Sequence, residues 1–262
     1  MGIDGDDMTN VTPIPPPARG LLLLEGRALL ELAALLPAYP VLRRAPSGDG
    51  HAVLVFPGLM ASDFSTRALR RFLRDKGYHA HGWKQGRNLG PSDALIGAMI
   101  ERLTDVHRRS GRRVSLIGWS LGGIYARELA RAMPDLVRQV ITLASPFRDL
   151  DAVNVPRFLQ TRARSRNPLQ DDSLVRARLR ESLSVPTTAI FSRSDGITAG
   201  DSCRAETGPQ TENLEVESSH LGIGHHPVVL LTIADRLAQP EGGWRPFAPP
   251  TGWRFPLVPR VA

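Results

Sequence analysis

The chain has 262 residues, of which 42% are hydrophobic, with a formal net charge of +7 and a single cysteine. This composition excludes a disordered chain, and the length suits one large domain or two small ones. With one cysteine, Cys203, the chain can form neither an internal disulfide nor a cysteine-based zinc cluster. The basic residues are almost all arginines scattered among acids, so we expect no nucleic-acid partner.

The amino-terminal part divides into an arm and a helix. Residues 1–19 include the stretch TPIPPPARG and predict a flexible arm. In residues 20–49, the run from Leu21 to Leu36 fits an amphipathic helix, followed by a linker. We expect this helix to pack on the domain, with a surface for a partner or a membrane interface as the alternative. Its charged residues exclude a transmembrane segment, and without a secretory signal we expect a cytoplasmic protein.

Short apolar runs alternate with helix-like runs between residues 50 and 240. The apolar runs occupy residues 51–56, 79–83, 114–119, 139–145, 187–192 and 213–217. They are rich in Val, Ile and Leu without polar alternation, as is typical of buried parallel strands. The alternation predicts an α/β domain with a mostly parallel sheet of about six strands and helices on both faces.

Two segments depart from this alternation. The fourth and fifth strand-like runs are separated by more residues than a crossover needs, which predicts a small helical cap inserted at about 149–185. We expect two short helices there, near Val155–Arg164 and Asp172–Ser182. The seven arginines from Arg157 to Arg180 are expected to face solvent, with anion recognition as the alternative. Residues 241–262 are rich in Pro and aromatic residues and predict a tail that lies over the domain or a partner.

The stretch LIGWSLGG contains the pattern G-x-S-x-G between a strand-like run and a helix-like run. A serine nucleophile must be exposed on a tight strand-to-helix turn, where flanking side chains would collide. Gly118 and Gly122 remove those collisions, so the pattern predicts Ser120 as a nucleophile.

Attack by a serine on a carbonyl also requires donors for the oxyanion. The backbone N–H of Leu121, at the start of the following helix, is one candidate. The stretch VLVFPGLMASD after the first strand supplies the second at Leu59, with Met60 as the alternative. In the loop GWKQGRNLGPS, we expect Arg87 and Asn88 to support the site through hydrogen bonds, with direct substrate contact as the alternative.

A serine nucleophile needs a base. The stretch ESSHLGIGHHP follows the last strand-like run, and its His220 has the position expected for that base. His225 and His226 precede a proline at the start of the final helix, so we interpret them as surface or capping residues.

The base in turn needs a carboxylate that fixes its tautomer. Asp195, in SRSDGI, follows a strand-like run and is the expected acid. Asp201 is the alternative, and Asp149 and Asp151 are weaker candidates. The order Ser120, Asp195, His220 is that of the α/β hydrolases.

From about residue 50 to 240, these motifs resemble the α/β hydrolase superfamily, and within it bacterial lipase-like and esterase-like members. The matching stretches are FPG before a helix, GWSLGGIYARELA, TLASPF, SRSDGI and SSHLG. The chain departs from larger members in two respects. It lacks room for the antiparallel strands that usually open their sheet, and Pro57 replaces the usual His of the oxyanion loop. The resemblance implies a compact α/β hydrolase fold and a set of site residues: Ser120 as nucleophile, Asp195 as acid, His220 as base, and Leu59 and Leu121 as the oxyanion hole.

The resemblance also implies the reaction. It indicates a serine hydrolase that cleaves small-molecule or lipid carboxylic esters through an acyl-enzyme, with no metal or organic cofactor. An acyltransferase, a thioesterase or an amidase would use the same triad, and a non-catalytic binding module is the alternative from another class. The amino-terminal helix or the aromatic tail is a candidate surface for a homodimer.

Overall fold

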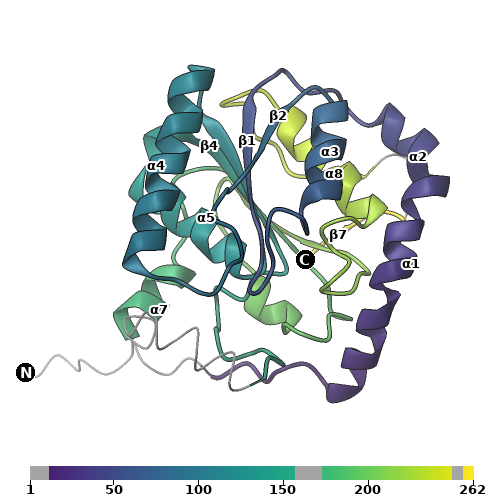
Figure 1. Ribbon diagram of the computed structural model, residues 1–262. Helices are drawn as coiled ribbons and strands as arrows, with labels where there is room; N and C mark the ends of the chain where they lie inside the picture. Colours follow the sequence, from purple (N-terminus) through teal and green to yellow (C-terminus); the bar gives the residue numbers. More distant parts are fainter. Residues whose placement is uncertain (1–11, 157–172, 250–255) are drawn as a thin grey trace, which may run out of the picture.

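The computed structural model describes residues 12–156, 173–249 and 256–262. Within them the strands form one sheet in the order β2-β1-β3-β4-β5-β6-β7 (Figure 1). Strands β1 to β6 pair in parallel, and β7 pairs antiparallel with β6. The strands are β1 (Ala52–Phe56), β2 (His79–Gly82), β3 (Val114–Trp119), β4 (Val137–Leu143), β5 (Thr187–Phe191), β6 (Thr211–Glu215) and β7 (Arg260–Val261).

The predicted α/β sheet is confirmed, with one strand more than expected. The tail adds β7, in which Val261 pairs with Leu214 and Arg260 with Glu215. Two residues are too few to show a strand period in a sequence, so this pairing escapes prediction.

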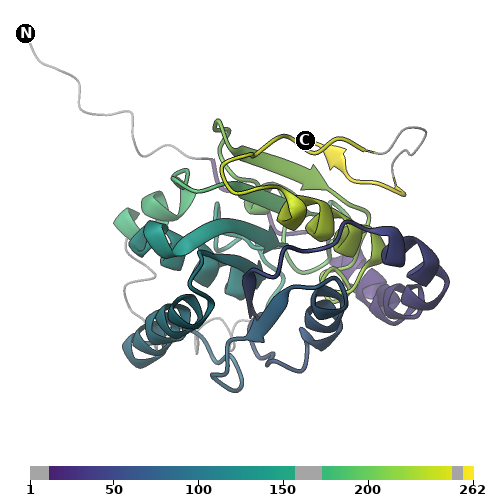
Figure 2. The ribbon, with the colours of Figure 1, turned by 90° about the horizontal axis from the view of Figure 1, so that it is seen from above.

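Helices cover both faces of the sheet. Figures 1 and 2 show α4 and α5 on one side and α3 and α8 on the other. None of the helices in the described part of the chain has the length and apolarity that a membrane span requires. The helices are η1 (Arg19–Arg27), α1 (Ala28–Ala33), α2 (Leu35–Arg44), α3 (Arg67–Asp75), α4 (Asp93–Ser110), α5 (Leu121–Ala132), η2 (Pro134–Leu136), α7 (Ser173–Arg180), η4 (Gly200–Cys203) and α8 (Pro227–Ala238).

Side chains of successive strand residues enter two different cores. Val53 and Val55 of β1 belong to the cluster that includes residues of α3 and α8. Leu54 and Phe56 belong to the cluster that includes residues of α4 and α5. Because both faces of β1 are buried, this strand is apolar throughout, which explains the absence of polar alternation in its sequence.

The amino-terminal helical segment, η1 to α2, packs on the domain in two ways: α2 through apolar residues such as Leu42, and η1 and α1 through carboxylates. It continues to Arg44, farther than the predicted end at Leu36. Glu25 and Glu31 are buried, whereas Leu23 and Leu36 are 86% and 82% exposed. In η1 and α1 the polar face therefore contacts the domain, which reverses the usual orientation of an amphipathic helix.

The predicted cap lies partly outside the described residues. The expected helix at Val155–Arg164 lies almost wholly there, whereas α7 falls within the second expected cap helix. Its arginines contact the protein itself: Arg178 pairs with Glu128 at 2.5 Å, and Nε of Arg180 donates to the carbonyl oxygen of Arg148 at 2.8 Å.

The carboxyl-terminal tail lies over the domain, as expected for the part that is described. Phe247 is buried, and its N–H donates to Oε2 of Glu212 at 2.7 Å. Trp253 and Phe255 lie outside the described residues.

The strand order places a topological switch point between β1 and β3 at the carboxyl edge of the sheet. From β1 the chain crosses to β2 on one side, whereas from β3 it crosses to β4 on the other. Loops that leave neighbouring strands in opposite directions open a crevice, and ligands of open α/β sheets bind there. Pro57 follows β1 and Ser120 follows β3, so both lie at this point.

Candidate functional site

Ser120 occupies the strained turn that the sequence predicts. It lies between β3 and α5 with φ 54° and ψ −124°, a conformation that costs a non-glycine residue about 1–3 kcal/mol. A Cβ on Gly118 would lie 2.3 Å from the carbonyl oxygen of Gly122, and one on Gly122 would lie 2.4 Å from that of Phe56. Both neighbours are backbone atoms, so the turn requires glycine at both positions.

The loop after β1 passes directly beside Ser120. A Cβ on Gly58 would lie 3.2 Å from Cβ of Ser120 and 3.8 Å from its Oγ. Asn88 holds this loop: its Nδ2 donates to the carbonyl oxygen of Pro57 at 2.9 Å, and its N–H donates to that of Ala61 at 2.8 Å. Asn88 is fully buried, whereas its expected companion Arg87 is exposed.

The two N–H groups expected to bind an oxyanion have no acceptor among the described residues. Neither Leu59 nor Leu121 donates its N–H to any residue in the described ranges. The alternative donor, Met60, donates its N–H to the carbonyl oxygen of Asn88 at 2.6 Å. This contact favours Leu59 over Met60 as the donor from the loop after β1.

His220 and Asp195 form a buried hydrogen-bonded pair. Nδ1 of His220 lies 2.7 Å from Oδ2 of Asp195. Asp195 also accepts the N–H groups of Ile197 and Thr198 at 2.7 Å each, and the Thr198 hydroxyl at 2.8 Å. With Nδ1 held by the carboxylate, Nε2 of the imidazole is available to accept a proton.

Opposing effects set the pKa of His220. Burial lowers it, but the charge of Asp195, the hydrogen bond to that carboxylate and the charge of Glu25 raise it by more. The net direction is a pKa above 6.5. A more basic imidazole is the change that a general base requires.

Trp119 joins the turn of Ser120 to the loop of His220. Its indole Nε1 donates to the carbonyl oxygen of His220 at 3.0 Å. The hydroxyl of Ser120 itself makes no hydrogen bond within the described residues. In enzymes without bound substrate, nucleophile-to-base contacts are often longer than in the reacting complex.

Comparison with known proteins identifies the fold. No family model and no curated protein matches the sequence. Among solved structures, Aspergillus fumigatus lipase B matches with a TM-score of 0.57 and 18% identity, over 74% of this chain and 53% of the lipase. Paleococcus ferrophilus monoacylglycerol lipase matches with a TM-score of 0.52 and 15% identity, over 73% of this chain and 96% of that one. The chain has the α/β hydrolase fold.

The chain spans only about half of the Aspergillus lipase. A further match, Bacillus licheniformis lipase BlEst2, has a TM-score of 0.51 and 16% identity over 73% of this chain and 94% of the lipase. The smaller neighbours are therefore covered almost completely, and the fold of the chain is that of their compact domains.

The other two histidines of the loop have surroundings that differ from those of His220. Nε2 of His225 lies 3.0 Å from the carbonyl oxygen of Ala28. His226 immediately precedes α8, and burial lowers its pKa. Of the three histidines in the loop, His220 is the one that contacts Asp195.

The alternative acids also have other partners. Asp201 lies 3.4 Å from Arg193 in an ion pair, and Asp149 accepts the N–H of Ile14 at 3.0 Å. Asp151 pairs with Arg176 at 2.9 Å. Among residues 12–156, 173–249 and 256–262, no group of three or more His, Cys, Asp or Glu side chains is arranged to hold a metal ion.

Glu25 of η1 reaches this site, although the sequence interpretation gives it no role there. Its Oε1 accepts the N–H of Gly196 at 2.9 Å and that of His220 at 3.0 Å, and its Oε2 accepts that of Leu221 at 2.9 Å. The only signal in the sequence is a carboxylate inside a leucine run, which is equally typical of the solvated face of a helix.

A second Ser–His–Asp set lies at the opposite edge of the sheet. Nε2 of His51 lies 2.8 Å from Oγ of Ser115, and its Nδ1 contacts Asp49. Ser115 and His51 are fully buried, and Ser115 lies inside β3 rather than on an exposed turn. This arrangement lacks access for a substrate and is a structural network.

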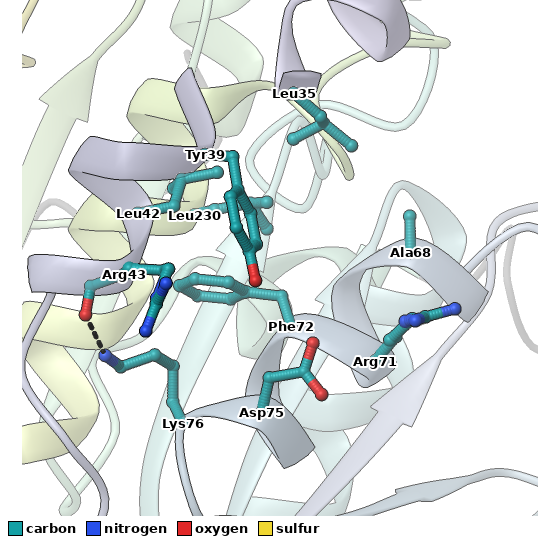
Figure 3. Close-up of a pocket in the computed structure, with 10 residues that line it drawn as sticks. All are labelled: Leu35, Tyr39, Leu42, Arg43, Ala68, Arg71, Phe72, Asp75, Lys76 and Leu230. Atoms are coloured by element: carbon teal, nitrogen blue, oxygen red, sulfur yellow. Dashed lines mark hydrogen bonds between the residues drawn. The ribbon is translucent and has the colours of Figure 1, made fainter. Parts of the chain in front are cut away.

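A cavity of about 520 Å³ lies between α2, α3 and α8, away from the triad candidates (Figure 3). At one end Nζ of Lys76 donates to the carbonyl oxygen of Arg43 at 3.1 Å, which joins the end of α3 to α2. The amino-terminal segment is thus attached to the domain at α2 as well as through Glu25. The lining residues are Leu35, Tyr39, Leu42, Arg43, Ala68, Arg71, Phe72, Asp75, Lys76 and Leu230.

Proposed function

We propose that the protein is a serine hydrolase that cleaves carboxylic esters through an acyl-enzyme. The observation that carries this proposal is the pairing of His220 with Asp195 on the loop that Trp119 joins to the strained turn of Ser120. The fold shared with solved lipases supports it. Whether the ester is a lipid or a smaller molecule is decided by the acyl-chain series described below.

The residues act in two half-reactions. Oγ of Ser120 attacks the ester carbonyl carbon while Nε2 of His220 takes the hydroxyl proton, and the N–H groups of Leu59 and Leu121 bind the oxyanion. The carbon–oxygen bond to the alcohol breaks, and His220 gives that proton to the leaving alkoxide. Water then attacks the acyl-enzyme, giving its proton to His220, which returns it to Ser120 as the acid leaves. Asp195 keeps the imidazole oriented throughout.

The cytoplasmic location that the sequence predicts belongs to the same proposal. Cys203 is buried as a free thiol, so no disulfide in the described residues requires an oxidising compartment.

The proposal is tested by fluorophosphonate labelling of the purified full chain, with the modified peptide identified by mass spectrometry. We expect the label on Ser120 and its loss in Ser120→Ala and His220→Ala. Ester hydrolysis by Ser120→Ala should fall about 10⁶-fold if the triad acts as a unit. Ser115→Ala is the matched control, because it removes the serine of the buried set and should leave labelling intact.

The outcome also separates the alternatives. A series of p-nitrophenyl esters of increasing acyl length defines the substrate class. Transfer of the acyl group to an added alcohol or amine in preference to water would indicate an acyltransferase. Absence of label on Ser120 in the folded wild-type chain would contradict the proposal and favour a binding module.

A further inference from the structure

The amino-terminal segment brings two buried carboxylates to the loops of the proposed acid and base. Glu25 and Glu31 are 6% and 8% exposed. Glu31 accepts the N–H of Ser219 at 2.8 Å through Oε1 and the Ser219 hydroxyl at 2.5 Å through Oε2. Ser219 directly precedes His220, so consecutive residues of the base loop are held by two carboxylates from one segment.

Glu25 joins the two loops to each other. A single oxygen, Oε1, accepts the N–H of Gly196, the residue after Asp195, and the N–H of His220 itself. One atom therefore fixes the backbone of the acid loop relative to that of the base loop. A carboxylate can do this because each oxygen accepts more than one hydrogen bond and carries charge, and such bonds are stronger than neutral ones.

The loops are shaped to receive this segment. A Cβ on Gly196 would lie 2.5 Å from the carbonyl oxygen of Leu21, and one on Gly222 would lie 1.4 Å from Oε2 of Glu31. Arg27 adds a contact between the amino-terminal segment and the Asp195 loop, because its guanidinium donates to the carbonyl oxygen of Ser194 at 3.0 Å. Both glycines thus permit a close approach that any larger residue would block.

We propose that Glu25 and Glu31 are positioning residues of the active site, holding the His220 loop and the Asp195 loop in the geometry that catalysis needs. The inference rests on the proposed function. It makes the amino-terminal segment part of the catalytic apparatus, although the segment lies outside the part of the chain that carries the family motifs. Neither carboxylate touches substrate; each acts through the backbone of the base or the acid.

Two substitutions at Glu25 distinguish the contribution of its charge from that of its side-chain length. Glu25→Gln keeps the length but has one acceptor oxygen for three N–H groups, and it removes a charge that raises the pKa of His220. Glu25→Asp keeps the charge but is one methylene shorter. We expect kcat to fall about 10- to 100-fold in both, with KM changed less than about threefold, because small displacements of catalytic groups have effects of this size.

The pH profile distinguishes positioning from simple stabilisation of the fold. In Glu25→Gln the acid limb of kcat/KM should move to lower pH, whereas in Glu25→Asp it should stay near the wild-type position. Glu101→Gln, an exposed carboxylate of α4, is the matched control and should leave kcat and the limb unchanged. All variants are assayed as full chains at temperatures below their measured Tm.

Glu31→Gln provides a second test with a smaller disruption, because in the base loop it weakens only the contacts to Ser219, besides the ion pair of Glu31 with Arg27 at 3.4 Å. A folded Glu25→Gln with wild-type kcat and an unmoved acid limb would overturn the proposal, as would unfolding of both Gln variants, which would assign the carboxylates to stability only. Failure of the proposed function gives a different result, because the wild-type chain itself would then not label at Ser120.

Discussion

The indole of Trp119 donates a hydrogen bond of 3.0 Å to the carbonyl oxygen of His220, although 101 residues separate them in the chain. Trp119 is the last residue of β3 and directly precedes Ser120. The sheet thus fixes the His220 loop relative to Ser120 through Trp119, and Glu25 fixes the same loop from the amino-terminal segment. His220 is therefore held by two separate contacts, one from Trp119 and one from Glu25.

Trp119→Phe tests the support from the sheet. The variant keeps an aromatic ring but leaves a buried carbonyl without its donor, which costs about 1–3 kcal/mol. We expect a lower Tm and a kcat reduced about tenfold through displacement of the His220 loop. Ester hydrolysis and thermal unfolding of the same preparation are the measurements. A lower Tm with unchanged kcat would show that the contact stabilises the fold without positioning the base.

The proposed role of His220 as general base predicts the pH dependence of activity. The base must be neutral to accept the Ser120 proton, and its pKa is raised above 6.5. Activity should therefore fall as pH decreases through a midpoint above 6.5 in the kcat/KM profile of the free enzyme. Asp195→Asn removes the charge that raises this pKa, so the midpoint should move to lower pH, and kcat should fall by about 10⁴. A midpoint well below 6.5 in the wild-type chain would contradict the assignment of His220.

Two glycine substitutions test the turn at Ser120. Gly122→Ala places a Cβ 2.4 Å from the carbonyl oxygen of Phe56, a backbone atom that cannot move freely. We expect a loss of about 3 kcal/mol in the free energy of unfolding and loss of labelling at Ser120. Gly97→Ala in α4 is the control, because nothing lies within 4 Å of its Cβ. There the helix should gain about 0.5–1 kcal/mol. Chemical denaturation of both variants gives the comparison.

The sequence carries strong signals for the triad candidates because each depends on local chemistry. Ser120, Asp195 and His220 each follow a buried strand, and the carboxyl ends of parallel strands share one edge of the sheet. Gly118 and Gly122 identify the turn because no other residue fits. The contact between Asp195 and His220 could therefore be expected before any coordinates were known.

The roles of Glu25 and Glu31 could not be predicted, because nothing local distinguishes them. In a run where leucines outnumber charged residues, the apolar side is expected to face the domain. Here the domain offers N–H groups of two loops rather than an apolar surface, and those groups require acceptors. The N–H groups belong to residues about 170 to 190 positions away in the chain: Gly196 for Glu25 and Ser219 for Glu31. The periodicity of one helix contains no information about such distant residues.

The buried His51 network makes a prediction for stability. Burial lowers the pKa of His51, the Asp49 carboxylate raises it, and the charge of Arg138 lowers it again, with a net direction below 6.5. Below pH 6.5 the unfolded chain therefore binds a proton at this residue that the folded chain does not. Stability should fall as pH decreases in this range, by up to about 1.4 kcal/mol per pH unit.

His51→Gln isolates this contribution. His81 and His226 also have lowered pKa values because of burial, so the wild-type slope contains their effects as well. His220 has the opposite effect on the pH dependence of stability. Because its pKa is raised on folding, it stabilises the folded chain below pH 6.5, and this contribution is lost as the pH rises through the pKa of the folded state. Denaturation of both chains between pH 5 and 7 should give a shallower slope for His51→Gln. Parallel curves would show that His51 takes up its proton in the folded protein as readily as in the unfolded chain.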